Sequence, residues 1–320
     1  ETGFFGERMV ASRVNFFLIG APKAGTTLIH ARLSRHPEVF LSPLKEPNHF
    51  ATDIDPTRFS AAFRANVPGD LEGYLADRPL KPRQIGFVQD PEHYSALFEG
   101  AEKAQRVVGE CSTSYLWSTE AAANVAATHP DARILVVLRN PVERLHSHWL
   151  MARKYGFTRL PLLEAVEQDR AHPDPGWGRS ELFVQAGLYA DALGRWQQAF
   201  PAGKVKVLLN EELDNPDTWS DLADWLGLDG AIPDVDRTEG NPAGRARWEG
   251  LNAWLTRTGL KSSLGALLPA GMKRKVSGAW YTGDDLPSLN EEDRAALTPL
   301  FQADIRATEA LLDRSLSHWC

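Results

Sequence analysis

Short apolar runs, rich in β-branched and aromatic residues and separated by polar or glycine-containing turns, dominate the hydrophobic pattern of the chain. These runs lie at residues 16–19, 39–41, 107–108, 134–138 and 207–209, and the strand segments they indicate extend to 106–110 and 204–209. Continuous apolar runs of this length are typical of strands that are buried on both faces, as in a parallel sheet. The pattern therefore predicts strands that lie inside a layered α/β structure.

Helical patterns fill the intervals between these runs. Pro141 falls at a first helical position, where the missing N–H costs nothing, and Asn290 is a candidate N-cap residue. Helices are expected at residues 28–35, 57–65, 91–97, 121–128, 187–196, 219–226 and 290–312. Strands that alternate with helices predict an α/β fold of three layers, in which helices flank a central parallel sheet.

No feature of the sequence divides the chain into separate domains. Its 320 residues are 43% hydrophobic, which is enough to bury a substantial core, and no repeat, low-complexity tract or linker interrupts them. We therefore expect a single domain over residues 1–320. Within it, residues 53–91 are rich in proline and weakly periodic, so they are expected to form an irregular insertion that walls the substrate site. Residues 237–285 are a candidate lid over nucleotide or acceptor.

Candidate chemistry begins with residues 15–27, NFFLIGAPKAGTT, where a predicted strand runs into a loop and then into a helix. Backbone N–H groups converge at such a junction, and the helix dipole favours a negatively charged ligand. Gly20 and Gly25 keep the spacing of the phosphate loop, G-x-x-x-x-G-K-[ST], and Thr27 keeps its hydroxyl. The sequence therefore predicts an anion site, although a glycine-rich turn remains the plain alternative.

The lysine of this loop is in an unusual place. Thr26 stands where the phosphate loop has its lysine, and Lys23 lies inside the loop instead. This difference counts against a P-loop nucleotide kinase, since such an enzyme needs the lysine that reaches the terminal phosphates. The pattern P-K-x-G-T-T resembles the 5′-phosphosulfate loop of sulfotransferases that use 3′-phosphoadenosine 5′-phosphosulfate (PAPS). The resemblance implies a P-loop-like fold and a cofactor-binding role for Lys23, Ala24, Gly25, Thr26 and Thr27.

A second candidate site is the segment LKEPNHF at residues 44–50, just beyond a predicted strand. Catalytic groups of open α/β sheets gather at such strand ends. The segment resembles the K-E-P-x-x-F segment of bacterial and heparan-type sulfotransferases, whose glutamate is proposed to take the proton of the acceptor. The resemblance implies that Glu46 is the catalytic base; a surface Lys–Glu pair is the alternative. His49 stands where the family often has an aromatic residue, and it is a candidate substrate-binding residue.

The strand predicted at residues 106–110 leads into a third motif. The chain has the G-E-x-S-x-x-Y pattern of the same family at Gly109, Glu110, Ser112 and Tyr115. Cys111 occupies the position where heparan-type relatives carry a lysine near the reaction centre. This departure weakens the case for a heparan-like acceptor, and it removes one positive group from the transferring sulfuryl.

A fourth motif follows the apolar run at residues 134–138. Arg139 lies at the end of this predicted strand, and Ser147 lies about two turns into the helix that starts at Pro141. An arginine offers a bidentate fork to a phosphate, and a serine adds one donor. The spacing resembles the 3′-phosphate site of the sulfotransferases, which implies that Arg139 and Ser147 bind the nucleotide.

These blocks resemble the sulfotransferase family, in order, from Asn15 to Trp319. The resemblance implies that a sulfuryl group moves from PAPS to an acceptor hydroxyl or amine by in-line displacement, which leaves 3′-phosphoadenosine 5′-phosphate (PAP). Lys23 would neutralise the bridging oxygen as the bond breaks, Glu46 would act as the base, and no metal would be needed. A non-catalytic nucleotide-binding protein with this fold remains an alternative.

Composition limits the partners and the location. The net charge of −7 gives no support to a nucleic-acid partner, and no segment approaches the about 20 apolar residues that span a membrane. Two cysteines, Cys111 and Cys320, suit a reducing compartment, so we expect a cytoplasmic protein. The acceptor is left open among small molecules, glycans and carrier-bound groups. The sequence also leaves open the oligomeric state, an anchor preceding Glu1, and the role of the basic residues 272–275.

Overall fold

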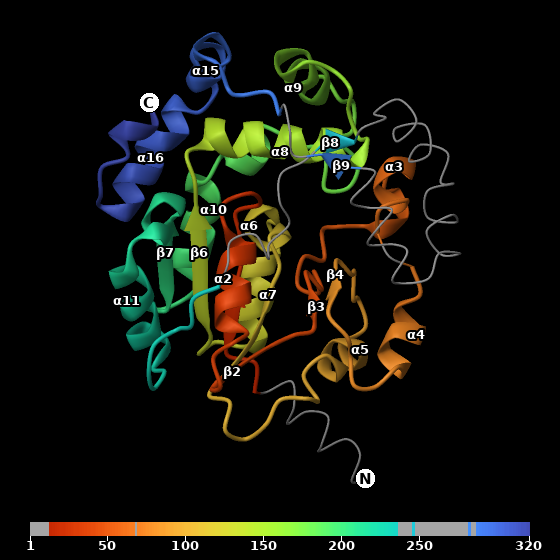
Figure 1. Ribbon diagram of the computed structural model, residues 1–320, viewed down its shortest axis with the longest axis vertical. Coiled ribbons are helices and arrows are strands. Elements are labelled where there is room, and N and C mark those ends of the chain that lie inside the picture. Colours follow the sequence, from red (N-terminus) through yellow and green to blue (C-terminus); the bar gives the residue numbers. More distant parts are fainter. Residues whose placement is uncertain (1–12, 68, 236–244, 247–280, 283–285) are drawn as a thin grey trace. The chain divides into compact units, whose positions relative to one another are not determined.

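The computed structural model describes residues 13–67, 69–235, 245–246, 281–282 and 286–320 (Figure 1). The chain divides into two compact units that interleave along the sequence. The first comprises Glu1–Asp53, Gly69–Arg139 and Tyr189–Gly240, and the second comprises Ile54–Pro68, Asn140–Leu188 and Asn241–Cys320. The single domain over 1–320 stays a prediction, and most of the candidate lid at 237–285 lies outside the described residues.

The first unit contains the central sheet. Its strands are β1 (Phe16–Leu18), β2 (Val39–Leu41), β5 (Val107–Cys111), β6 (Arg133–Leu138) and β7 (Val205–Leu209). They pair in parallel in the order β2-β5-β1-β6-β7. Strands β1 and β5 are completely buried; the continuous apolar run of β1 predicts this for a sheet covered on both faces, and β5 buries Glu110 as well. The predicted strands and their parallel arrangement are confirmed.

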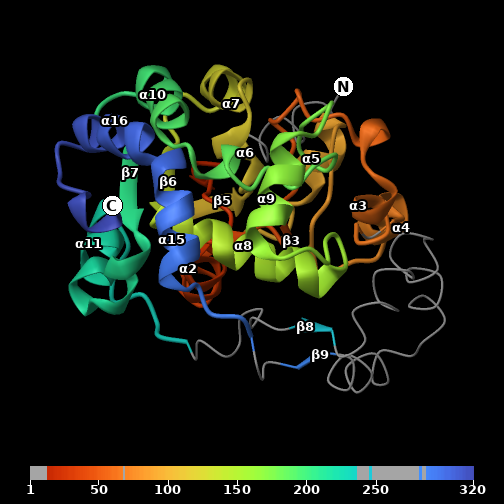
Figure 2. The same ribbon diagram turned by 90° about the horizontal axis from the view of Figure 1, so that it is seen from above.

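Helices cover both faces of this sheet. Figure 2 shows α6, α7 and α10 on one face and α2 and α11 on the other. Their bounds are α2 (Thr26–Leu33), α6 (Ser114–Trp117), α7 (Ala121–Thr128), α10 (Ala190–Ala199) and α11 (Pro216–Leu226). The chain leaves β1 toward one edge and later leaves β5 toward the other, so right-handed crossovers place α2 and α7 on opposite faces. The predicted three-layer α/β fold is confirmed.

The strand order also determines where a ligand site forms. Strands β1 and β5 are neighbours, and the helices that follow them lie on opposite faces. A crevice opens at the carboxyl ends of two such strands. The register brings Leu18 opposite Cys111, and the Ser112 N–H donates to the Leu18 carbonyl over 3.0 Å. The phosphate-loop segment and the G-E-x-S-x-x-Y motif therefore start side by side.

The predicted irregular insertion at 53–91 contains the short helices expected near 57–65 and 91–97, the first of them split in two, and also a helix and a strand that were not predicted. Its elements in the first unit are α4 (Leu71–Ala76) and β4 (Arg83–Gln84), and α5 (Pro91–Ala96) follows; η1 (Pro56–Arg58) and α3 (Ala61–Arg64) belong to the second unit. Strand β4 pairs in parallel with β3 (Leu44–Lys45), which brings Lys45 opposite Gln84. Two-residue strands have no periodicity, so this pairing was not predicted.

The described part of the second unit is mostly helical. It contains α8 (Pro141–Tyr155), α9 (Leu162–Arg170), η2 (Gln185–Gly187), β8 (Arg245–Ala246), β9 (Tyr281–Thr282), α15 (Glu291–Leu297), η5 (Thr298–Leu300), α16 (Gln302–Leu312) and η6 (Ser317–Trp319). Pro141 is the first residue of α8 and Asn290 caps α15, as predicted. The single helix expected at 290–312 is wrong: Pro299, which cannot donate a backbone hydrogen bond, lies where the chain tightens into η5. No helix in the described part of the chain is both long and apolar enough to cross a membrane.

Candidate active site

The loop between β1 and α2 is held against the neighbouring strand β6. Gly20 accepts a hydrogen bond from the Val137 N–H (2.8 Å), and the Ala21 N–H donates to the Val137 carbonyl (2.6 Å). The loop turns through positive φ values at Gly20 (139°), Lys23 (68°) and Gly25 (110°). It then enters α2, whose first N–H groups have no partner within the helix. Its backbone therefore suits an anion in front of the helix.

Residues that follow β7 support the loop from behind. The Asn210 side-chain amide donates to the Ala24 carbonyl over 2.9 Å. This bond fixes the peptide between Ala24 and Gly25, so the direction of the next N–H is fixed as well. A Cβ atom added to Gly25 would lie 2.6 Å from Leu213 Cδ1 and 3.0 Å from Asn210 Nδ2. Gly25 is thus required both for its conformation and for the close approach of this support.

We expect Gly25→Ala to weaken PAP binding at least about 10-fold and to destabilise the fold by about 1–3 kcal/mol. The added methyl group would enforce strain at positive φ and displace Asn210 or Leu213. Calorimetric titration with PAP and thermal unfolding measure the two effects. Gly194→Ala is the matched control, because nothing lies within 4 Å of its added Cβ and the residue is inside α10. This control should gain about 0.5–1 kcal/mol. Equal behaviour of the two variants would contradict the role of Gly25.

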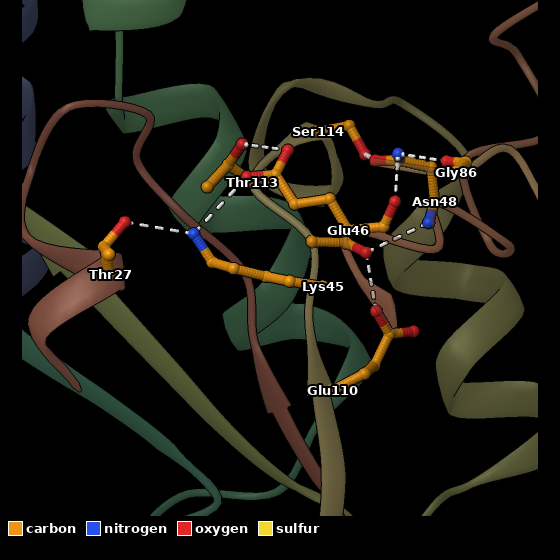
Figure 3. A network of polar contacts seen from close by, with 9 residues as sticks. Thr27, Lys45, Glu46, Asn48, Gly86, Glu110, Thr113 and Ser114 are labelled. Carbon is orange, nitrogen blue, oxygen red and sulfur yellow. Dashed lines mark hydrogen bonds and ion pairs between the residues drawn. The ribbon is translucent and has the colours of Figure 1, made fainter. Parts of the chain in front are cut away.

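Glu46 lies at the carboxyl end of β5, held by its backbone. Its N–H donates to the Cys111 carbonyl (2.7 Å), and its own carbonyl accepts from the Gly86 N–H (2.9 Å). Its φ is 61°, in the left-handed region. Adjacent residues of a regular strand point to opposite faces. The left-handed turn breaks this alternation, so the side chains of Lys45 and Glu46 converge (Figure 3).

Lys45 connects the Glu46 carboxylate to Thr27, in the segment of residues 15–27. The Thr113 hydroxyl donates to Glu46 Oε2 (3.2 Å), while Lys45 Nζ lies 3.8 Å from Glu46 Oε1. Lys45 also donates to Thr27 Oγ1 over 3.1 Å (Figure 3). The side chains of Lys45 and Glu46 are only 8% and 18% exposed. A charged pair buried to this degree, beside the loop after β1, is not a solvated surface pair.

Lys45 is a site residue that the sequence alone did not reveal. The signal was the charged pair inside LKEPNHF, but strand alternation would have directed Lys45 away from Glu46. Cys111, where heparan-type relatives carry a lysine, is fully buried, and burial raises its pKa to about 12, so its thiol stays neutral. Lys45 lies close enough to Cys111 for its positive charge to oppose this rise in the pKa of the thiol. The neighbourhood of position 111 therefore contains one positive group, Lys45 of β3.

Beneath Glu46, the Glu110 side chain is fully buried and surrounded by hydroxyl groups. It accepts hydrogen bonds from Ser112 (2.5 Å), Tyr115 (2.6 Å) and Tyr94 (3.1 Å). Burial raises the pKa of Glu110 to about 7, although the three hydroxyl donors oppose the shift by stabilising its charged form; the nearby Glu46 adds to the rise. The G-E-x-S-x-x-Y motif is thus a single buried cluster.

Gly109, the first residue of this motif, has a different role. A Cβ atom at Gly109 would lie 2.1 Å from the Phe16 carbonyl oxygen. Only glycine therefore permits β1 and β5 to pair where Phe16 lies opposite Gly109.

Asn48 connects the Glu110 cluster to the backbone of Glu46. Its side-chain amide donates to the carbonyls of Glu46 and Gly86, both over 2.7 Å (Figure 3). Its N–H donates to Ser112 Oγ (3.1 Å), and its side-chain oxygen accepts from Ser114 (2.5 Å). Asn48 is 5% exposed and has a φ of 55°. The turn that presents Glu46 is therefore held on both sides.

His49 packs into the wall behind this turn. Its ring stacks on Tyr94, with centroids 4.2 Å apart and an interplanar angle of 12°. Its Nδ1 donates to the Val88 carbonyl (2.7 Å), so Nδ1 carries the hydrogen. Burial lowers the pKa of His49, and its ring stays neutral near pH 7. Contact with the acceptor stays a prediction.

Arg139 follows β6 and is directed at the loop. Its guanidinium lies 3.5 Å from the Lys23 carbonyl, and its own carbonyl accepts a hydrogen bond from the Tyr189 hydroxyl (2.8 Å). Both contacts lie within the first unit. Ser147, its predicted companion, is on α8 in the second unit, so the pair itself stays a prediction.

Comparisons with known proteins agree on the family. A model of the sulfotransferase family matches residues 15–228. Carbohydrate sulfotransferase 15 of Rattus norvegicus is 32% identical over 158 residues, which cover 42% of this chain and 27% of that protein. Heparan sulfate glucosamine 3-O-sulfotransferase 3A1 of Mus musculus is 25% identical over 233 residues, which cover 70% of this chain and 49% of that protein. The matches thus span half or less of these relatives.

A solved structure resembles almost the whole chain. The crystal structure of a sulfotransferase from Alicyclobacillus acidocaldarius superposes with a TM-score of 0.66 at 27% identity, and covers 96% of this chain and 98% of that one. The family match includes the loop after β1, Glu46, the Glu110 cluster and Arg139. On the fold, the site and these similarities, the chain belongs to the sulfotransferase family.

Proposed function

We propose that this chain transfers a sulfuryl group from PAPS to an acceptor hydroxyl, with Glu46 as the base. One observation carries the proposal: the partly buried Glu46 carboxylate is joined through Lys45 to Thr27, at the start of α2 and near the carboxyl ends of β1 and β5. A base and an anion site that meet in this way suit the transfer of a charged group to a nucleophile.

The donor would bind along the carboxyl edge of the sheet. The loop after β1 offers backbone N–H groups to the 5′-phosphosulfate, and Lys23 adds a positive charge there. Arg139, whose guanidinium approaches the Lys23 carbonyl, offers a fork to the 3′-phosphate. Both of these contributions come from described residues of the first unit.

The proposed reaction depends on stabilising charge in the transition state more than on covalent catalysis. The acceptor oxygen attacks sulfur in line with the bridging oxygen, its proton passes to Glu46, and the bond from sulfur to the bridging oxygen breaks. Lys23 stabilises the negative charge that develops on this bridging oxygen. Lys45 adds a positive charge where loop and base meet. As in phosphoryl transfer, positioning and electrostatics then supply most of the rate.

The names of the relatives favour one acceptor class. Carbohydrate sulfotransferase 15 and the heparan sulfate glucosamine 3-O-sulfotransferase are named for sugar acceptors. We therefore infer a glycan hydroxyl as the first acceptor to test, ahead of amines and small aromatic molecules. Cys111 replaces the lysine of heparan-type relatives, so an acceptor less acidic than heparan fits the site better.

We expect Arg139→Ala to weaken PAP binding by about 10- to 100-fold and to change kcat less than it changes KM for PAPS. The variant removes charge-assisted hydrogen bonds to a phosphate that does not react. Equilibrium titration with PAP and steady-state kinetics measure the split. Arg133→Ala is the matched control, since Arg133 starts β6 at the opposite edge of the sheet. A variant that loses kcat but retains PAP affinity would assign Arg139 to the reaction instead.

A binding experiment tests the nucleotide class. Calorimetry with PAP, and separately with ATP and Mg²⁺, separates the proposed function from a nucleotide kinase. We expect PAP to bind in the micromolar range or tighter, about −8 kcal/mol, and ATP to bind much more weakly. Preference for ATP and Mg²⁺ would contradict the proposal.

A further inference from the structure

We propose that Ser112 and Asn48 are positioning residues that hold the Glu46 carboxylate in place for catalysis, with buried Glu110 as their anchor. This inference rests on the proposed role of Glu46 as the base. Neither Ser112 nor Asn48 touches the reacting atoms, and each acts through the backbone of the turn that presents Glu46.

The need for support follows from the backbone. Glu46 and Asn48 have φ values of 61° and 55°, so two non-glycine residues within one short turn adopt a conformation that L side chains avoid. Such a turn persists only when surrounding contacts determine it. Without them, Glu46 would relax toward an extended strand and direct its carboxylate away from Lys45 and Thr113.

A continuous series of hydrogen bonds supplies this support (Figure 3). The Ser112 hydroxyl donates to Glu110 (2.5 Å), and its oxygen accepts from the Asn48 N–H (3.1 Å). The Asn48 amide then donates to the Glu46 carbonyl (2.7 Å). Ser112, Asn48 and Glu110 are all at most 5% exposed, so water cannot readily replace a lost bond. The series runs from the sheet interior to the base.

Two hydroxyl donors to Glu110 can be compared, because only one of them is also hydrogen-bonded to the turn that presents Glu46. Tyr94 and Ser112 each donate a hydroxyl to Glu110, but Ser112 alone of the two also binds Asn48. Ser112→Ala and Tyr94→Phe therefore remove the same kind of bond from the same carboxylate. The Phe ring keeps the ring contacts of Tyr94 with His49 and Phe98. Each variant loses one buried hydrogen bond to Glu110, but the proposal predicts that Ser112→Ala lowers kcat more than Tyr94→Phe does.

A double-mutant cycle with Glu46→Gln tests the inference on the full chain, with PAPS and the best acceptor. We expect Ser112→Ala to lower kcat about 10-fold with KM for PAPS unchanged, and Tyr94→Phe to lower it less than about 3-fold. In the Glu46→Gln background, Ser112→Ala should lower the remaining rate less than about 2-fold, because a residue that acts only through Glu46 has nothing left to position. Asn48→Gly is the second variant; it keeps the positive φ without strain but removes the amide, and it should match Ser112→Ala.

Two results would overturn the inference. One is equal loss of kcat in Ser112→Ala and Tyr94→Phe, which would indicate a general effect on the cluster. The other is an undiminished loss from Ser112→Ala in the Glu46→Gln background. Should Ser112→Ala fail to fold, the same two comparisons are made with Asn48→Gly. Failure of the proposed base is recognised separately, since Glu46→Gln alone would then retain near-normal kcat.

Discussion

Replacing Glu46 by Gln is expected to lower kcat by about 10²-fold or more while PAP binding changes less than about 2-fold. Glutamine keeps the size of the side chain and can still accept from Thr113, but it cannot take the acceptor proton. The carboxylate lies beside the anion loop rather than in it, so the nucleotide should bind as before. Initial rates with saturating PAPS, together with titration of PAP, measure the two quantities.

Glu102→Gln is the control for this variant, because Glu102 is exposed on the amino-terminal side of β5 and the same chemical change is made there. Its kcat should equal that of the unmodified chain. Near-normal turnover in Glu46→Gln would remove Glu46 as the base and direct attention to His49.

Lys23→Met is expected to lower kcat by about 10²- to 10³-fold, with a smaller effect on PAP affinity. The variant keeps an unbranched side chain at a position with φ of 68°, so the loop should retain its path. It removes the positive charge that would stabilise the bridging oxygen as the bond to sulfur breaks. Pre-steady-state measurement of PAP formation reports this step directly.

The control for the lysine is Lys103→Met, an exposed position of the same unit. Rates for this control should be unchanged. If Lys23→Met reduced PAP affinity as strongly as kcat, Lys23 would bind the nucleotide in the ground state rather than stabilise the transition state.

Local sequence was enough to predict the frame of the site. The apolar runs that became β1 and β6 are continuous, and such runs indicate buried parallel strands. Pro141 began its helix as predicted, because its missing N–H is tolerated only there. The strand, loop and helix at residues 15–27 were predictable for the same reason, since the apolar run, the glycine spacing and the helix start are all local features; anion binding there stays a prediction.

The arrangement of side chains around Glu46 was not predictable in the same way. Lys45 and Glu46 converge because a left-handed turn interrupts strand alternation, and that turn depends on backbone bonds to Cys111 and Gly86. These partners are far away in sequence, and the β3–β4 pairing that brings Gly86 there is too short to show a periodicity. Asn48 looked like a variable position inside K-E-P-x-x-F, yet it joins the turn to the Glu110 cluster.

Transfer of radiolabelled sulfur from PAPS tests the central claim most directly. The full chain is incubated with labelled PAPS and a panel of glycan, small-molecule and carrier-bound acceptors, and labelled acceptor and PAP are quantified together. We predict equal amounts of sulfated acceptor and PAP from the unmodified chain, and almost none from Glu46→Gln although it still binds PAP. Bound PAPS with no labelled acceptor across the panel, or unchanged transfer by Glu46→Gln, would contradict this prediction.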